Sequence, residues 1–200
     1  MLQAYGLKYY LMERGTDVEI VNYEPPFMTG WYWWIPYIPA GGILCSLKWG
    51  LSIWRNHLKR GTSFFKQRSN MKRFRKKYLI EKTQKRVLFT YQLKYLPYQS
   101  YIVGSDQIWN PDITCGLRRA YFGAFKNRSK KKVIAYAASI GGVSLPEEYN
   151  KEFSELIKYV DSISVREESS IPYIKQFYSK DVLAVPDPVF FIEKKELGED

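Results

Sequence analysis

The stretch YIVGSDQIWNP, residues 101–111, decides the fold of this chain. Its first part, Tyr101 to Val103, is a short apolar run that predicts a buried strand. The glycine-led polar turn Gly104-Ser105-Asp106-Gln107 follows directly, and Trp109 then offers an aromatic anchor. Open α/β sheets present ligand-binding groups in this way, at the carboxyl ends of their strands. The same pattern also fits an ordinary strand-to-loop junction of an α/β protein.

The pattern of an apolar strand followed by glycine or polar residues recurs three more times downstream. Amphipathic helices are predicted between the later strands, and one of them starts with Ser144 as N-cap and Glu147 at N3. This alternation of strands and helices implies parallel pairing with right-handed crossovers, so the sequence predicts an α/β fold with a parallel sheet flanked by helices. The predicted strands and their exits are Val133–Ala138 before Ser139 and Gly141-Gly142, Asp161–Val165 before Arg166-Glu167, and Val182–Val185 before Asp187.

The four strand exits share one edge of such a sheet and supply the candidate site residues. Asp106, at the exit of the first strand, is the candidate catalytic residue. Arg166 stands near a helix start and can hold a carboxylate or phosphate in a bidentate fork. The candidate substrate-binding positions around them are Gly104, Ser105, Gln107, Ser139 and Gly141. Structural alternatives are an ion pair of Arg166 with Glu167 or Glu168, a turn-stabilising role for Asp106, and a structural role for Asp187.

The flanks of this core carry further predicted elements. Leu2 to Arg14 predicts a helix that ends at Gly15, and Val18 to Val21 predicts a strand. Residues 87–98 are interpreted as a connector, and Arg119 to Phe125 predicts another short strand.

Residues 25–47 contain no charged side chain and are rich in tryptophan. Pro36, Pro39 and the Gly41-Gly42 pair would break a membrane-spanning helix, so a packed flap or an interfacial patch is favoured over a span. The following segment, Thr62 to Arg86, is strongly basic with an aromatic side. It can be a solvated helix face or can lie on anionic lipid, and because no nucleic-acid motif accompanies it, no nucleic-acid partner is expected.

The composition limits the available chemistry. The net charge of +11 favours anionic partners. Two cysteines and one histidine provide neither a metal-ligand spacing nor a Ser-His or Cys-His pair, so no metal and no cofactor are expected. No secretory signal is visible, and a cytoplasmic setting fits best.

The ordered segments of the chain resemble the polysaccharide pyruvyl transferase family. The segments that carry the resemblance are Leu2–Pro25, Ile102–Pro111, Tyr121–Phe125, Lys132–Gly141, Ser162–Ser170 and Val185–Phe191, of which GSDQIWNP is the most specific. The resemblance implies two Rossmann-like domains that face each other as in GT-B enzymes. It also implies transfer of the enolpyruvyl group of phosphoenolpyruvate to a sugar, as a pyruvate ketal, in exopolysaccharide or cell-wall glycan synthesis.

The resemblance also assigns roles and partners. Arg166 would bind phosphoenolpyruvate, Asp106 would act on protons or position a hydroxyl, and a sugar or lipid-linked glycan would be the acceptor. The chain is expected to be a single N-terminal Rossmann-like domain over residues 1–200, with an aromatic and basic insertion at 27–78. It is expected to be trimmed at both ends, to lack the C-terminal domain with its histidine, and to be inactive alone. The alternative function is a non-catalytic module that binds an anionic glycan precursor or the inner membrane surface, the latter as a peripheral contact.

Overall fold

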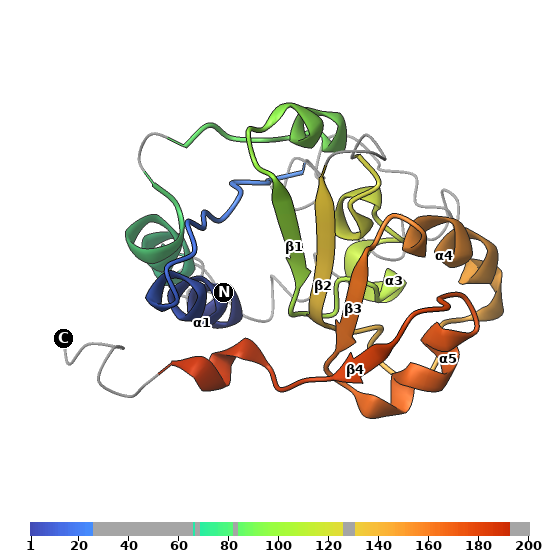
Figure 1. Ribbon diagram of the computed structural model, residues 1–200. Coiled ribbons are helices and arrows are strands. Elements are labelled where there is room, and N and C mark those ends of the chain that lie inside the picture. The colour runs from blue at the N-terminus through green and yellow to red at the C-terminus, as the bar shows by residue number, and fades with distance from the viewer. Residues whose placement is uncertain (26–65, 67–68, 82–83, 126–130, 193–200) are drawn as a thin grey trace. The chain divides into compact units, whose positions relative to one another are not determined.

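The computed structural model describes residues 1–25, 66, 69–81, 84–125 and 131–192 (Figure 1). The chain divides into two compact units, one of Met1 with Glu19–Phe89 and one of Leu2–Val18 with Thr90–Asp200. All strands of the sheet and all candidate site residues belong to the second unit. Most of the expected insertion at 27–78, including its tryptophan-rich part, lies outside the described residues.

The second unit contains a four-stranded sheet in the order β1-β2-β3-β4, and every neighbouring pair of strands is parallel. This confirms the α/β fold with a parallel, Rossmann-like sheet and flanking helices. Tyr101 pairs with Val133 in register, and Ile163 pairs with Val182. Because the strands are parallel, their carboxyl ends lie along one edge, as the sequence predicts. The strands are β1 Ser100–Gly104, β2 Lys132–Ala138, β3 Ser162–Val165 and β4 Val182–Ala184.

Helices cover the two faces of the sheet differently. The helices α3 (Pro111–Thr114), α4 (Asn150–Ile157) and α5 (Ile171–Lys175) lie on one side, and α1 (Leu2–Glu13) lies on the other (Figure 1). Alternate residues of β2 follow this division, since Val133, Ala135 and Ala137 are fully buried. Tyr136 points the other way, toward Phe191, with 6.2 Å between the ring centroids.

An aromatic cluster forms the centre of the core beneath the strand exits. Trp109 is fully buried and stacks on Phe122 at a centroid distance of 5.1 Å. Phe153 of α4 meets both rings edge-on, at 5.8 and 5.7 Å. The indole Nε1 of Trp109 donates to the carbonyl of Tyr121 at 3.0 Å, so its one polar group is satisfied. The predicted role of Trp109 as an anchor is confirmed.

Helix α1 packs against the short 3-10 helix η8, Pro188–Phe191, which follows β4. A β-carbon on Gly6 would overlap the carbonyl oxygen of Pro188, so glycine lets the two backbones approach. The rings of Tyr10 and Phe191 stack at 4.3 Å. The helix predicted over Leu2–Arg14 is therefore present, and it is fixed beside the exit of β4.

Three local predictions were wrong. The predicted strand over Arg119–Phe125 is a 3-10 helix, Arg119–Phe122. Gly123 ends this helix at a φ of 65°, and the amide of Ala124 bonds back to the carbonyl of Arg119 at 2.9 Å, so short-range hydrogen bonds replace a strand ladder. Ser144 is no N-cap, because Pro146 begins a 3-10 turn, Glu147–Tyr149, that leads into α4.

The third wrong prediction is the strand over Val18–Val21, which the structure does not form. The connector at 87–98 is partly structured. The only pairing described near that strand is an isolated parallel bridge between Tyr23 and Val87. Here the amide of Val87 donates to the Asn22 carbonyl at 2.9 Å, and the amide of Glu24 donates to the Val87 carbonyl at 2.8 Å. The connector contains a 3-10 helix, Thr90–Tyr95.

In the first unit, helical residues 69–74 lead into a π-helical turn, Arg75–Leu79. Glu24 pairs with Arg75 and also accepts from Arg86 Nε at 2.6 Å, while Asn22 accepts from Arg75. Within the part of the chain that the structure describes, every helix is too short or too polar to cross a bilayer.

Candidate functional site

The loops after β1 and β2 are joined through the backbone. The amide of Ser139 donates to the carbonyl of Asp106 at 3.2 Å, and the amide of Trp109 donates to the carbonyl of Ser139 at 3.1 Å. The Asp106 side chain is exposed, and its Oδ1 accepts from the Gln107 amide at 2.8 Å. The turn-stabilising contact expected as an alternative for Asp106 is thus present, and the residue remains exposed to solvent.

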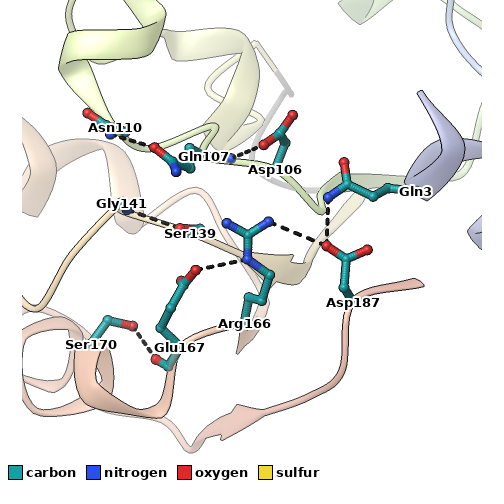
Figure 2. Close-up of polar contacts among 10 residues, drawn as sticks. All are labelled: Gln3, Asp106, Gln107, Asn110, Ser139, Gly141, Arg166, Glu167, Ser170 and Asp187. Carbon is teal, nitrogen blue, oxygen red and sulfur yellow. Dashed lines mark hydrogen bonds and ion pairs between the residues drawn. The ribbon is translucent and has the colours of Figure 1, made fainter. Parts of the chain in front are cut away.

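Three of the predicted binding residues make contacts within the protein (Figure 2). Ser139 is fully buried, and its Oγ accepts from the Gly141 amide at 3.0 Å. Gly141 has a φ of 80°, and a β-carbon there would overlap the side-chain amide of Asn110. That amide donates to Oε1 of Gln107 at 2.7 Å. Ser139, Gly141 and Gln107 therefore shape the two loops, whatever they do for a ligand.

The start of the β1 loop is tightly packed. Gly104 has a φ of 127°, and a β-carbon there would overlap the carbonyl oxygen of Tyr136 on the neighbouring strand. Ser105 is 4% exposed, and its Oγ has no hydrogen-bond partner among the described residues. An unpaired buried hydroxyl costs about 1–3 kcal/mol, which a polar ligand atom or a water molecule would recover.

Arg166 lies at the exit of β3 between two carboxylates. Its Nε donates to Glu167 Oε1 at 2.8 Å, and its Nη1 lies 3.4 Å from Asp187 Oδ2. The ion pair with Glu167 that the sequence allowed is therefore formed. Burial acts to lower the pKa of Arg166, but the hydrogen bonds and negative charges of Glu167 and Asp187 outweigh it and raise the pKa above its ordinary value. The guanidinium is permanently charged and held in place from two sides.

Asp187 connects Arg166 to two further parts of the fold. Its Oδ2 also accepts from Gln3 Nε2 of α1 at 2.6 Å, and its Oδ1 accepts from the Val189 amide at 3.0 Å as the N-cap of η8. The structural role allowed for Asp187 is thus realised. Gln3 was missed by the sequence reasoning, because the 184 positions between Gln3 and Asp187 leave no local signal of their contact.

The structure brings the predicted residues together as two neighbouring groups. One group holds Asp106, Gln107, Ser139 and Gly141, and the other holds Arg166 with its carboxylates. The amide of Arg166 donates to the carbonyl of Ala138 at 3.2 Å, which ties the two groups along the strand edge. Figure 2 shows the guanidinium between Glu167 and Asp187, with its tip directed toward the loop that carries Asp106 and Gln107.

The charge of this edge contrasts with that of the whole chain. One guanidinium faces the carboxylates of Glu167 and Asp187, and the exposed Asp106 adds a third negative charge nearby along the edge. Such a set can bind hydroxyl groups through the carboxylates and an anion through the guanidinium. Among the described residues, no three His, Cys, Asp or Glu side chains gather as a metal site.

The fold and the site together define a Rossmann-like α/β protein whose polar groups meet at the carboxyl ends of its strands. A family model for polysaccharide pyruvyl transferase matches residues 1–200, so the chain belongs to the polysaccharide pyruvyl transferase family. This membership indicates a pyruvyl transferase-like function in polysaccharide biosynthesis, with a glycan as acceptor. Searches among curated proteins and among solved structures found no match.

Proposed function

We propose that the strand edge of the second unit binds phosphoenolpyruvate and passes its enolpyruvyl group to a sugar as a pyruvate ketal. The observation that carries this proposal is that a fixed, charged guanidinium and an exposed carboxylate lie at the same edge of the sheet. Arg166 supplies the first at the exit of β3, and Asp106 supplies the second at the exit of β1.

Arg166 is proposed to bind the donor. Phosphoenolpyruvate carries a carboxylate and a phosphate, and a guanidinium matches the geometry of either group. Among the described residues, the contacts of Arg166 with Glu167 and Asp187 use Nε and Nη1, which leaves Nη2 for a ligand. Glu167 and Asp187 orient the guanidinium, and they also compete with the incoming anion for it. Binding therefore depends on how closely the two carboxylates approach Arg166.

Asp106 is proposed to move protons during transfer. Two hydroxyl groups of the sugar add to C2 of phosphoenolpyruvate and lose their protons, the methylene carbon gains one proton to become a methyl group, and inorganic phosphate leaves with the other. The reaction therefore needs a group that accepts a proton from a sugar hydroxyl and returns one to the donor. An exposed carboxylate beside the donor site suits that role.

The wider architecture is part of this proposal and is suggested by the family resemblance. A second Rossmann-like domain would face this sheet edge, as in GT-B enzymes, and a lipid-linked glycan in the cytoplasm would present the sugar. The donor is consumed in the reaction, so phosphoenolpyruvate acts as a substrate and no separate cofactor is invoked.

Calorimetric titration with phosphoenolpyruvate tests the donor site. We expect binding by the wild type and a loss of at least about tenfold in affinity for Arg166→Ala, because a charge-assisted hydrogen bond is removed. Lys175→Gln, a charge change on α5, serves as a control and should bind like the wild type. If the wild type does not bind, or if Arg166→Ala binds equally well, the site is wrongly assigned.

A second candidate function rests on the basic helix of the first unit, residues 69–79. Lys72, Arg73 and Lys76 are exposed there, together with Met71, whose exposed fraction is 50%. Like charges three and four residues apart destabilise an isolated helix by about 0.2–0.5 kcal/mol per pair, which an anionic surface would offset. We propose that this helix contacts anionic lipid, where each basic residue contributes about 1 kcal/mol.

Co-sedimentation with phosphatidylglycerol vesicles tests the lipid contact. We expect the wild type to bind the vesicles and to bind less at high salt. At the same salt concentration, the double variant Lys72→Gln and Lys76→Gln should bind less than the wild type. The matched variant Lys132→Gln and Lys151→Gln removes the same charge from the second unit, where both lysines are accessible to solvent. Equal binding by the two double variants would contradict a role of the helix.

A further inference from the structure

Gln3 makes a polar contact that the proposed chemistry leaves unused. Its Nε2 donates to Asp187 Oδ2 at 2.6 Å, and the same oxygen lies 3.4 Å from Arg166 Nη1 (Figure 2). The side chain of Asp187 is 13% exposed, so both donors act on a largely buried carboxylate. Two donors thus share one oxygen atom, and the neutral amide lies closer to it than the guanidinium does.

The position of Gln3 is itself fixed by packing. Gly6 sits one turn further along α1, where a β-carbon would overlap the carbonyl of Pro188, the residue after Asp187. Tyr10 stacks on Phe191 at the far end of η8. Helix α1 and the segment after β4 are therefore in contact at Gln3, Gly6 and Tyr10. This packing fixes the distance between the amide of Gln3 and the carboxylate of Asp187.

The unequal sharing has a consequence for Arg166. If the amide of Gln3 were absent, Asp187 Oδ2 would lose its shortest hydrogen bond and would move toward the guanidinium to recover one. A closer ion pair would neutralise Arg166 more fully and would compete more strongly with an incoming anion. The amide thus keeps the second carboxylate of Arg166 at a distance without removing the charge that orients the guanidinium.

We infer that Gln3 is a positioning residue for the donor site: it holds Asp187 back so that Arg166 remains available to the anion. This inference rests on the proposed function of Arg166 as the phosphoenolpyruvate ligand. A merely structural role would predict something different, namely a change in the stability of α1 with no specific effect on anion affinity.

The test combines Gln3→Met, which keeps the length of the side chain but removes the donor, with Asp187→Asn in a double-mutant cycle. We expect Gln3→Met to weaken phosphoenolpyruvate binding by about tenfold in calorimetry, in line with the loss of one hydrogen bond to a charged group. In the Asp187→Asn background the same change should weaken binding by less than about twofold, because the competing charge is gone. Glu13→Gln, an exposed position at the end of α1, should bind like the wild type.

A measurement on the ligand-free protein tests the role of Gln3 independently of the proposed function. The Nη–H signal of Arg166 in nitrogen–proton correlation NMR reports on its contact with Asp187, and we expect it to shift in Gln3→Met but not in Glu13→Gln. Absence of binding by the wild type would refute the proposed function, while this signal would still decide the role of Gln3. An unshifted signal, or an equal loss of affinity in both backgrounds of the cycle, would overturn the inference. If Gln3→Met does not fold, Gln3→Asn, which shortens the side chain but keeps the amide, replaces it in both measurements.

Discussion

The guanidinium of Arg166 lies 3.4 Å from the carboxylate of Asp187, and this contact joins the exits of β3 and β4 across 21 positions of the chain. Glu167 contacts the same guanidinium from the other side, with 2.8 Å between its Oε1 and Arg166 Nε. A buried or half-buried ion pair contributes little net stability, because desolvation offsets much of the attraction. Its importance here lies in orientation, since the charged group of Arg166 is held at the edge where Asp106 also lies.

Asp106→Asn tests the proposed proton transfer by Asp106 without disturbing the conformation of its loop. The substituted side chain would keep an oxygen that can accept from the Gln107 amide, now bonded at 2.8 Å, so the loop should stay in place. The new amide cannot exchange a proton, and the loss of a general acid/base costs about 10²- to 10⁴-fold in rate. We expect ketal formation by the active enzyme to fall in that range while phosphoenolpyruvate affinity stays within about twofold. Unchanged turnover would remove Asp106 from the reaction.

Gly6→Ala tests the packing of α1 on η8. Alanine in place of glycine favours a helix by about 1 kcal/mol. Here the added carbon would overlap the carbonyl oxygen of Pro188, a backbone atom that cannot move aside. We expect a net loss of about 1–3 kcal/mol in the free energy of unfolding, measured with urea. Gly142→Ala is the control, because a β-carbon there has no neighbour within 4 Å among the described residues. A stabilised Gly6→Ala would show that the contact between α1 and Pro188 is loose.

Trp109→Ala tests the anchor of the β1 loop. The substitution leaves a cavity beside Phe122 and Phe153, whose ring centroids lie 5.1 and 5.8 Å from that of the indole. We expect a loss of about 3–5 kcal/mol in unfolding free energy, in line with other aromatic truncations in cores. Phe190→Ala removes an aromatic ring that is 78% exposed and should change stability by less than about 0.5 kcal/mol. Similar losses for both variants would contradict the central position of Trp109.

The raised pKa of Tyr101 leads us to predict that the protein loses stability at high pH. Burial, and to a smaller extent the charge of Tyr98, raises the pKa of Tyr101 from 10.0 to about 12. Its hydroxyl donates to the Leu93 carbonyl at 2.6 Å, so the native state keeps the proton after the unfolded state has lost it. The stability tied to this proton is complete below pH 10 and disappears as the pH rises toward 12.

The measurement is urea unfolding at several pH values within that window. Each unit of pH there should lower the free energy of unfolding by about 1.4 kcal/mol through Tyr101. Tyr101→Phe removes the titrating group and should show a shallower decline. The same slope in the variant and the wild type would mean that Tyr101 does not hold its proton in the folded state.

The sequence was sufficient for the four strands of the sheet and for the edge where they end. Apolar runs such as Val133–Ala138 are followed at once by small or polar residues, and these patterns are local. The parallel pairing of the strands and the exits at Asp106 and Arg166 could therefore be predicted. The family could be predicted as well, because an ordered set of segments is a property of the chain itself. Predictions failed where a few short-range hydrogen bonds decide between conformations, as in Arg119–Phe122, where an aromatic-rich run that is typical of a strand forms a 3-10 helix.

The sequence by itself determined the sheet, its direction and the identity of the polar residues at its edge, because strand and helix signals depend on neighbours in the chain. Only the tertiary structure decided how those residues are used. Ser139 is fully buried, Gln107 bonds to Asn110, and Arg166 lies between two carboxylates. Gln3 joins this edge from the other end of the chain, because contacts between distant segments follow from the packing of α1 on η8 and leave no local pattern in the sequence.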